Sequence, residues 1–285
     1  MFYLSDLDKT LLRTDLTLGA LTRTTWNTAV ASGEHLSIAT ARSYTGIREL
    51  LGDLDLREPM ILLDGTLIAA PDGTILHSAT LDQAVGAAIL EIAHRSTGEW
   101  PLIVALEPNG REQFYYPPEP NRYQQQLIAS MQIARRRFTT QTPTAQSHNL
   151  KIVYMQDAPT TAIIEAELKQ ALGDAIEVKR SADPYIDCYF LTVLHPEGDK
   201  AHALARLEEL EGVDRAHTTV FGDHHNDIGL FEMAGRKIAV ANAVPELKAL
   251  ADIVLPHTND EEGVAHFLTD KLGLHHRALK GGSAS

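Results

Sequence analysis

The sequence predicts an α/β protein with a Rossmann-like parallel sheet core, helices on both faces of that sheet, and an inserted α+β domain. Runs of alternating strand and helix patterns at the two ends of the chain predict the parallel sheet. The segment between these runs carries paired strand patterns instead. We therefore expect one core domain from residues 1–82 and 190–275, an insertion at 83–189 and a flexible tail at 276–285.

Both terminal runs pair short apolar segments with amphipathic ones. In the first run, strands are expected at Phe2–Leu4, Leu36–Ala39 and Met60–Leu63, and helices at Leu18–Ala31 and Tyr44–Leu51. In the second run, strands are expected at His217–Phe221, Lys237–Val240 and Asp252–Leu255, and helices at Asp227–Ala234 and Val244–Ala251. Strands that alternate with helices form parallel sheets, so the two runs are predicted to join one sheet.

The middle of the chain has a different pattern. Strands are expected at Leu102–Leu106, Gln113–Tyr116, Lys151–Met155, Ile176–Arg180 and Tyr185–Val193, and helices at Tyr123–Ile133 and Thr160–Leu172. The first two strands are close enough to pair with each other, as in an α+β domain.

Composition narrows the classes of function. The 285 residues carry a formal net charge of −13, which disfavours nucleic acid and anionic membranes as partners, because both attract clustered Lys and Arg. The single cysteine, Cys188, excludes an internal disulfide and a cysteine-cluster zinc site. The N-terminus lacks the pattern of a signal peptide, and the chain contains no apolar run long enough for a membrane span. We expect a cytoplasmic protein with a small-molecule partner; the oligomeric state is not predicted.

Two carboxylates follow the first predicted strand, in the segment Ser5-Asp6-Leu7-Asp8-Lys9-Thr10. One carboxylate can attack phosphorus while the other, when protonated, donates to a leaving alkoxide and later accepts a proton from water. The alternative is that Asp6 and Asp8 only stabilise a turn, since aspartate is common in turns.

Polar residues also follow two other predicted strands. Thr40 could hydrogen-bond a phosphate oxygen, or could serve as a helix N-cap. Asp223 and Asp227 follow Phe221-Gly222 and could hold one hard cation, or could belong to a solvated acidic turn. Lys200 could supply a positive charge near a phosphoryl group, although a lone lysine is usually a surface residue. Ligands of open α/β sheets bind at the carboxyl ends of strands, where these residues are expected to meet.

Together these segments resemble the four motifs of the haloacid dehalogenase superfamily, in the right order and over nearly the whole chain. The matching residues are Asp6, Asp8 and Thr10 for the first motif, Thr40 for the second, Lys200 for the third, and Gly222, Asp223, Asn226 and Asp227 for the fourth. The form of the fourth motif and the long insertion resemble the Cof-type branch with a type-two cap. Smaller similarities are found at Leu63-Asp64-Gly65-Thr66, at Ala241-Asn242-Ala243 with Lys248, and at Thr258-Asn259-Asp260 with Gly263-Val264.

The resemblance implies a phosphatase that acts on a small phosphorylated metabolite, such as a sugar phosphate, through an aspartyl-phosphate intermediate. Asp6 would be the nucleophile and Asp8 the general acid and base. Mg²⁺ would be held by Asp6, the backbone carbonyl of Asp8 and Asp223, and Asp227 would bind the ion directly or support one of its ligands. Thr40 and Lys200 would hold the phosphoryl oxygens, with Thr10 and Asn226 beside them.

Several positions differ from the family pattern or have no assigned role in it. Lys9 stands where a glycine is common, and Ala41 and Ala201 replace glycines that are usual after Thr40 and Lys200. His224 and His225 occupy variable positions, and we expect exposed loop histidines there because a hard-oxygen site does not need imidazole.

The family resemblance implies that the inserted cap closes over the site and sets specificity. The residues considered for this role are Arg122, Tyr123 and Tyr185. Alternative functions are a phosphomutase of the same superfamily, a catalytically silent phospho-ligand binding protein and, with least support, a phospho-accepting receiver domain.

Overall fold

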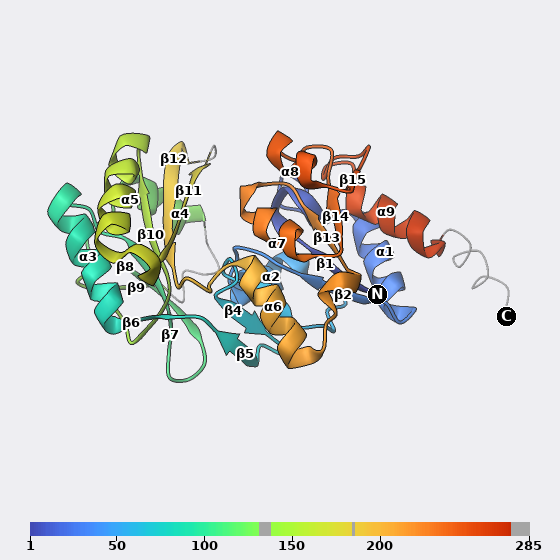
Figure 1. Ribbon diagram of the computed structural model, residues 1–285, viewed down its shortest axis with the longest axis horizontal. Helices are drawn as coiled ribbons and strands as arrows, with labels where there is room; N and C mark the ends of the chain where they lie inside the picture. The colour runs from blue at the N-terminus through green and yellow to red at the C-terminus, as the bar shows by residue number, and fades with distance from the viewer. Residues whose placement is uncertain (131–137, 184–185, 275–285) are drawn as a thin grey trace. The chain divides into compact units, whose positions relative to one another are not determined.

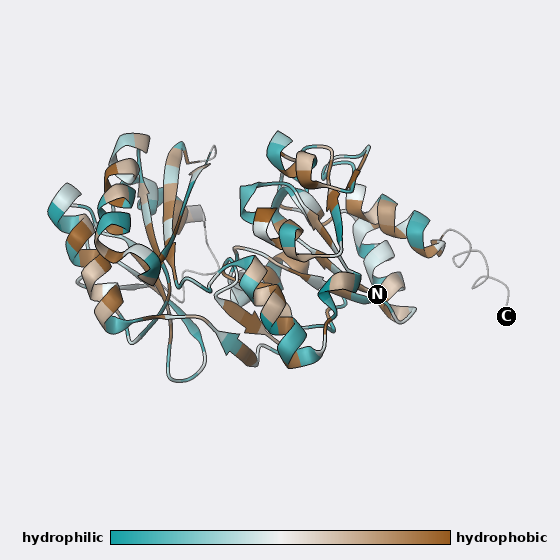
Figure 2. Cartoon of the chain, viewed as in Figure 1, coloured by the Kyte–Doolittle hydropathy of each residue, from teal (hydrophilic) through white to brown (hydrophobic). Residues whose placement is uncertain are grey.

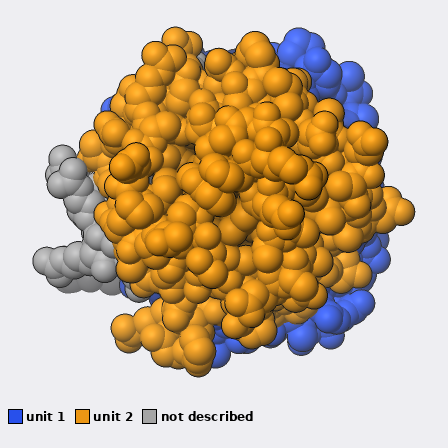
Figure 3. Space-filling view, turned by 90° about the vertical axis from the view of Figure 1, so that its left-hand side faces the viewer, with its two compact units in different colours: residues 1–76, 200–285 blue, residues 77–199 orange. Residues whose placement is uncertain are grey.

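The structure is a computed structural model, and it describes residues 1–130, 138–183 and 186–274. The chain divides into two compact units, which Figures 1 and 3 display. Unit 1 contains residues 1–76 and 200–285, and unit 2 contains residues 77–199. The domain boundaries expected at 82/83 and 189/190 stay predictions. The expected tail at 276–285 lies outside the described residues.

Unit 1 is built on a parallel five-stranded sheet with the strand order β15-β14-β13-β1-β2. The strands are β1 (Phe2–Ser5), β2 (His35–Ile38), β13 (Thr218–Gly222), β14 (Arg236–Ala239) and β15 (Ile253–Val254). The predicted parallel sheet is therefore confirmed. Strand β1 pairs with β2 on one side and with the distant β13 on the other, so residues from both ends of the chain meet beside its carboxyl end.

Helices cover this sheet. They are α1 (Ala20–Ala31), α2 (Tyr44–Leu51), α6 (Lys200–Glu211), α7 (Ile228–Met233), α8 (Pro245–Leu250) and α9 (Gly263–Leu272). Figure 1 shows α1 and α9 packed together on one side of the sheet, and α6 and α7 together on the other. Because the central strands are covered on both faces, they consist almost wholly of buried residues, and Figure 2 shows brown stretches on strands inside each unit.

The third predicted strand pairs differently from the expectation. Strand β3 (Met60–Leu62) pairs antiparallel with β4 (Leu67–Ala69), and β5 (Ile75–Ser78) is the third strand of this sheet. A single parallel bridge between Ala39 and Ile61 connects it to the end of β2. Alternation of strand and helix thus predicted the position of β3, but not its pairing partner.

Unit 2 contains a second sheet, in which β11-β12-β10-β7-β8-β9 are neighbours and β6 also pairs with β10. The strands are β6 (Leu81–Asp82), β7 (Leu102–Leu106), β8 (Glu112–Tyr116), β9 (Phe138–Thr140), β10 (His148–Gln156), β11 (Glu177–Asp183) and β12 (Cys188–Leu194). Its pairs are antiparallel except for β8 with β9, which is parallel. The predicted pairing of the strands at 102–106 and 113–116 is confirmed.

Two apolar clusters lie on opposite faces of this sheet, because successive strand residues point to opposite sides. Ile152 and Tyr154 of β10 belong to the cluster formed with α3 (Gln83–Thr97) and α5 (Ala158–Leu172). Val153 and Met155 belong to a smaller cluster that includes residues of α4 (Arg122–Ser130). The sheet of unit 2 is thus covered on both faces.

Some elements were not predicted from the sequence. They include the helices α3 and α9 and the short strands β4, β5, β6 and β9. Within the described ranges, no helix has the length and apolar character needed to cross a membrane.

Candidate active site

The candidate site begins at the carboxyl end of β1. The chain leaves β1 at Asp6, whose backbone amide donates a hydrogen bond of 2.9 Å to the carbonyl oxygen of Phe221 in β13. This bond holds the first residue after β1 against the last residues of β13. Asp223 follows β13 directly, so the two segments place carboxylates side by side although more than two hundred residues separate them.

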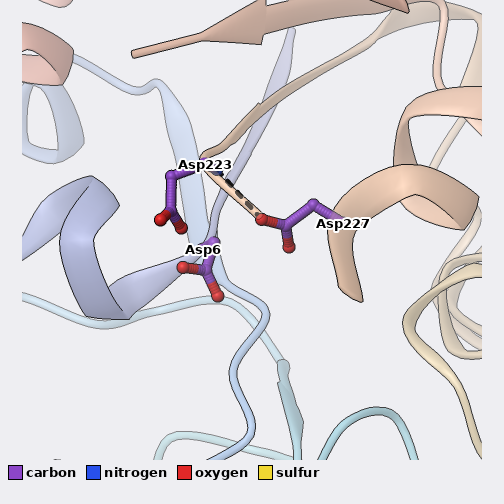
Figure 4. Close-up of side chains that lie close together, drawn as sticks. All are labelled: Asp6, Asp223 and Asp227. Carbon is purple, nitrogen blue, oxygen red and sulfur yellow. Dashed lines mark hydrogen bonds between the residues drawn. The ribbon is translucent and has the colours of Figure 1, made fainter. Parts of the chain in front are cut away.

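Three carboxylates gather at this edge. One oxygen each of Asp6, Asp223 and Asp227 lies within 4.8 Å of the other two, and Figure 4 shows the three side chains together. The residues are 5%, 5% and 0% exposed, which distinguishes them from a solvated acidic turn. Asp227 Oδ2 accepts hydrogen bonds from the amides of Asp223 (3.1 Å) and His224 (3.3 Å), which orient this carboxylate.

Lys200 brings a positive charge to the same site from the first residue of α6. Its Nζ lies 2.5 Å from Asp6 Oδ1 and 2.7 Å from Asp227 Oδ1, and the residue is 1% exposed. Burial lowers the pKa of Lys200, but the attraction of Asp227 and Asp6 outweighs burial and raises the pKa above its usual value. Lys200 is therefore a buried, charged residue and not a surface lysine.

The three carboxylates carry more negative charge than one lysine can balance. Burial, and then repulsion by Asp227 and Asp223, raises the pKa of Asp6 well above its usual value, although Lys200 opposes this shift. Burial and Asp227 raise the pKa of Asp223 to about 7. Fully ionised, the group would keep two negative charges unbalanced, which one divalent cation would neutralise. Clustered carboxylate oxygens suit a hard cation such as Mg²⁺, so the residues fit a metal site.

Asp8 lies apart from this group and pairs with Arg42. The Arg42 guanidinium donates from Nε to Asp8 Oδ2 at 2.8 Å and from Nη2 to Asp8 Oδ1 at 2.6 Å. The side chain of Asp8 is 38% exposed and that of Arg42 is 27% exposed. Arg42 was not predicted as a site residue. The signal that could have indicated the pair is its position just after β2, because β2 lies beside β1, the strand that precedes Asp8.

The predicted phosphate-binding residues occupy different environments. Thr10 is buried, and its hydroxyl donates to Asp223 Oδ1 at 3.2 Å. Thr40 is fully buried, and its Oγ1 accepts a hydrogen bond of 3.2 Å from the amide of Arg42, which leaves the hydroxyl hydrogen available to an acceptor. Asn226 is half-buried in the short 3₁₀ turn His225–Asp227.

The variable positions around the site are also placed. Lys9 has a left-handed backbone with φ 57° and ψ 12°, and its carbonyl accepts a 2.8 Å hydrogen bond from Asn242 Nδ2. His225 is exposed, as expected. The expected exposure of His224 is wrong: His224 is half-buried, because its ring packs edge-on against that of His225 with centroids 4.7 Å apart.

The residues considered for specificity lie in unit 2. Arg122 donates to the hydroxyl of Tyr123 at 2.5 Å, and its guanidinium lies 4.5 Å from the centre of the Tyr123 ring. Tyr185 lies outside the described residues.

Comparison with known proteins identifies the family. The sequence profile of the haloacid dehalogenase-like hydrolases matches residues 3–268. The chain belongs to this family. A haloacid dehalogenase-like hydrolase from Bacteroides thetaiotaomicron shares the fold with a TM-score of 0.79 at 24% identity, over 95% of this chain and 98% of that one. A HAD/COF-like hydrolase from Plasmodium vivax shares the fold with a TM-score of 0.76 at 21% identity, and the match covers 96% of this chain and 95% of that one.

Curated relatives of this haloacid dehalogenase-like chain are phosphatases. An HMP-PP phosphatase of Enterobacter is 31% identical, with 93% of each chain covered. A 5-amino-6-(5-phospho-D-ribitylamino)uracil phosphatase of Bacillus subtilis is 26% identical, with 94% of this chain and 96% of the relative covered. The family predicted from the sequence is confirmed.

Proposed function

We propose that this haloacid dehalogenase-like hydrolase is a magnesium-dependent phosphatase that cleaves a small phosphate monoester, with Asp6 as the nucleophile. The observation that carries the proposal is the buried group of Asp6, Asp223, Asp227 and Lys200 at the carboxyl ends of β1 and β13. Membership of the family and the named phosphatase relatives make the chain a phosphoric monoester hydrolase.

In the proposed reaction, a carboxylate oxygen of Asp6 attacks phosphorus in line with the leaving oxygen. The Asp6–phosphorus bond forms while the ester bond breaks, and Asp8 gives a proton to the leaving oxygen. Water then attacks the phosphorus of the aspartyl-phosphate, Asp8 takes a proton from this water, and inorganic phosphate and free Asp6 are released.

Mg²⁺ would be held by the carboxylates of Asp6, Asp223 and Asp227 and by the backbone carbonyl of Asp8. It would supply positive charge that reduces repulsion between the substrate and the nucleophile. Among the residues of the chain, Lys200 supplies charge of the same sign from α6 and touches both Asp6 and Asp227.

Positioning of the phosphoryl group is assigned to residues around the nucleophile. Thr40 would donate its hydroxyl hydrogen, and Lys200 an ammonium hydrogen, to phosphoryl oxygens. Asn226 would orient neighbouring groups or the phosphate. Thr10 would act beside them by holding Asp223, to which it is hydrogen-bonded.

The substrate class proposed is a small phosphorylated metabolite, such as a sugar phosphate or similar ester. The relatives named as HMP-PP phosphatase and as ribitylaminouracil phosphatase support this class. A phosphomutase would return an isomerised phosphate ester, and a silent binding protein would release none. Release of inorganic phosphate without an isomerised product distinguishes the proposal from both alternatives.

The deciding variant is Asp6→Asn, assayed with p-nitrophenyl phosphate and MgCl₂. Loss of the nucleophile should lower kcat by about a thousandfold or more, since the covalent step requires a carboxylate. Asp174→Asn makes the same chemical change at an exposed position in unit 2 and should retain wild-type turnover. Far-UV circular dichroism should show both variants folded. Turnover within about tenfold of wild type in folded Asp6→Asn would refute the mechanism.

A further inference from the structure

We propose that Arg42 is a positioning residue that holds the general acid and base, Asp8, in place beside the nucleophile. This inference rests on the proposed function, because it concerns the proton-transfer steps of the same site. Both carboxylate oxygens of Asp8 accept hydrogen bonds from Arg42, at 2.6 and 2.8 Å. Two parallel bonds fix the orientation of a carboxylate as well as its position.

Asp8 needs such a partner because of its surroundings. Its side chain is 38% exposed, so packing leaves it several rotamers. Three buried carboxylates lie in the neighbouring segments and repel a fourth negative charge. Without Arg42, both effects favour positions of Asp8 turned out to solvent, from which it cannot reach a leaving oxygen.

Arg42 is itself held by its main chain. Its amide donates to Thr40 Oγ1 at 3.2 Å, and its carbonyl accepts from the amide of Leu63 at 3.0 Å. The next residue, Ser43, caps α2 by accepting from the amide of Gly46. The guanidinium therefore extends from a backbone segment that is fixed on both sides.

The segment that contacts the Arg42 carbonyl is strained. Leu63, Asp64 and Gly65 have successive positive φ angles of 50°, 65° and 118°. Left-handed backbone costs energy at Leu63 and Asp64, and such strain is kept where the surrounding structure over-determines it. Hydrogen bonds from Leu63 to Arg42 and from Asp64 to the Thr40 carbonyl tie this segment to the loop that carries Arg42.

A carboxylate that accepts both bonds from Arg42 cannot donate. In the acid step Asp8 carries a proton on one oxygen and gives it to the leaving oxygen, while its other oxygen still accepts from Arg42. The role of Arg42 is to keep Asp8 near the reacting atoms, so its removal should affect the steps that need Asp8. Formation of the aspartyl-phosphate depends on general acid help in proportion to how poor the leaving group is. Substrates with different leaving groups therefore distinguish two roles of Arg42. A residue that positions Asp8 affects poor leaving groups most, whereas a purely structural residue affects all substrates equally.

The test measures kcat/KM for p-nitrophenyl phosphate and for phenyl phosphate, which have similar shapes but a good and a poor leaving group. Arg42→Gln should lower kcat/KM for phenyl phosphate about a hundredfold and for p-nitrophenyl phosphate less than about tenfold. Asp8→Asn should show the same difference between substrates. The double variant Arg42→Gln/Asp8→Asn should be no slower than Asp8→Asn alone, because Arg42 acts through Asp8.

Control and rescue variants complete the design. Arg57→Gln breaks another bidentate Arg–Asp pair, formed with Asp55 at 2.7 and 3.2 Å in the loop before β3, and should leave the kinetics unchanged. Arg42→Lys keeps the charge without the planar fork and should lose less than Arg42→Gln. If Arg42→Gln does not fold, Arg42→Lys and its double variant with Asp8→Asn replace it in the same comparison.

Two results would overturn the inference. One is a multiplicative loss in the double variant, which would mean that Arg42 acts independently of Asp8. The other is an equal loss on both substrates in the Arg42 variants. Either result is distinct from failure of the proposed function, which would appear as an inactive wild-type protein or an active Asp6→Asn variant.

Discussion

Lys9 has the backbone conformation that glycine adopts most readily, immediately after Asp8 in the turn that follows β1. Its φ of 57° and ψ of 12° lie in the left-handed region, where a Cβ atom is crowded by the backbone. A glycine is common at this position in the family, and the left-handed backbone gives the physical reason for that preference. The Lys9 charge also lowers the pKa of Asp223, although less than the Thr10 hydrogen bond and Lys200 do.

Replacing Lys9 by glycine should stabilise the protein. The change relieves left-handed strain in the folded state, but glycine also adds conformational entropy to the unfolded chain. Because the first effect is larger, the free energy of unfolding should rise by about 0.5–1 kcal/mol. Urea unfolding followed by circular dichroism measures the change. Lys9→Ala removes the same charge but keeps a Cβ atom, so it should give no comparable gain; an equal gain in both variants would attribute the effect to charge.

At the scale of elements, single residues at the ends of strands and helices determine how neighbouring segments pack. A Cβ atom at Gly222 would lie 2.7 Å from Asp227 Oδ2, so the last residue of β13 must be glycine for Asp227 to approach the strand. The φ of Gly222 is not in the left-handed region, and close approach is therefore the reason for this glycine.

In unit 2, the side chain of Asp82 caps α3 by accepting from the amide of Val85 at 2.8 Å.

Asp82→Ala should weaken unit 2. The change leaves one amide at the start of α3 without its side-chain acceptor, which should lower the free energy of unfolding by about 1 kcal/mol. Chemical denaturation monitored by helical circular dichroism gives the value. Glu91→Ala, which removes the same charge from an exposed position within α3, should change stability by less than about 0.5 kcal/mol. Similar losses in the two variants would show that charge, and not capping, explains the effect.

At the scale of the molecule, the candidate metal site joins segments that are distant in the chain. Asp6 follows β1, Lys200 begins α6, and Asp223 and Asp227 follow β13. A cation bound by this group would tie these segments together in the folded state and would bind the unfolded chain weakly. Metal binding is thus coupled to the stability of unit 1.

Addition of excess MgCl₂ should raise the melting temperature, and the rise should be larger at pH 8 than at pH 5.5. The pKa of Asp223 is raised to about 7, so protons compete with the metal below that pH, and the affinity should fall about tenfold per pH unit. Without metal, stability should change with pH in the opposite direction. Folded Asp223 binds its proton more tightly than Asp223 of the unfolded chain does, so the free energy of unfolding should decrease as pH rises from about 4 to about 7.

Thermal unfolding with MgCl₂ or EDTA at the two pH values provides the measurement. Asp223→Asn should lose most of the magnesium-induced shift. The interpretation would be contradicted by a shift of equal size at both pH values, or by an Asp223→Asn variant that still shows the full wild-type shift.

Much of the fold was predictable from local pattern. The bounds of α2 and β7 match the expected ranges, and the bounds of the five parallel strands lie within one residue of theirs. Helix α3 was not predicted, although its buried residues Ile89, Leu90 and Ala93 have the three- and four-residue spacing of a helix. The antiparallel pairing of β3 was also missed, since strand patterns carry no information about the partner.

The sequence by itself determined the family and the alternation of strands and helices, because local spacing encodes secondary structure. Its motifs also indicated the candidate site residues, which are Asp6, Asp8, Lys200, Asp223 and Asp227. Only the tertiary structure decided which of these carboxylates meet. It placed three of them with Lys200 in a buried group and turned Asp8 toward Arg42. The physical reason is that burial and ion pairing depend on distances between strand ends, which are set by the order of strands in the sheet and not by neighbouring residues in the chain.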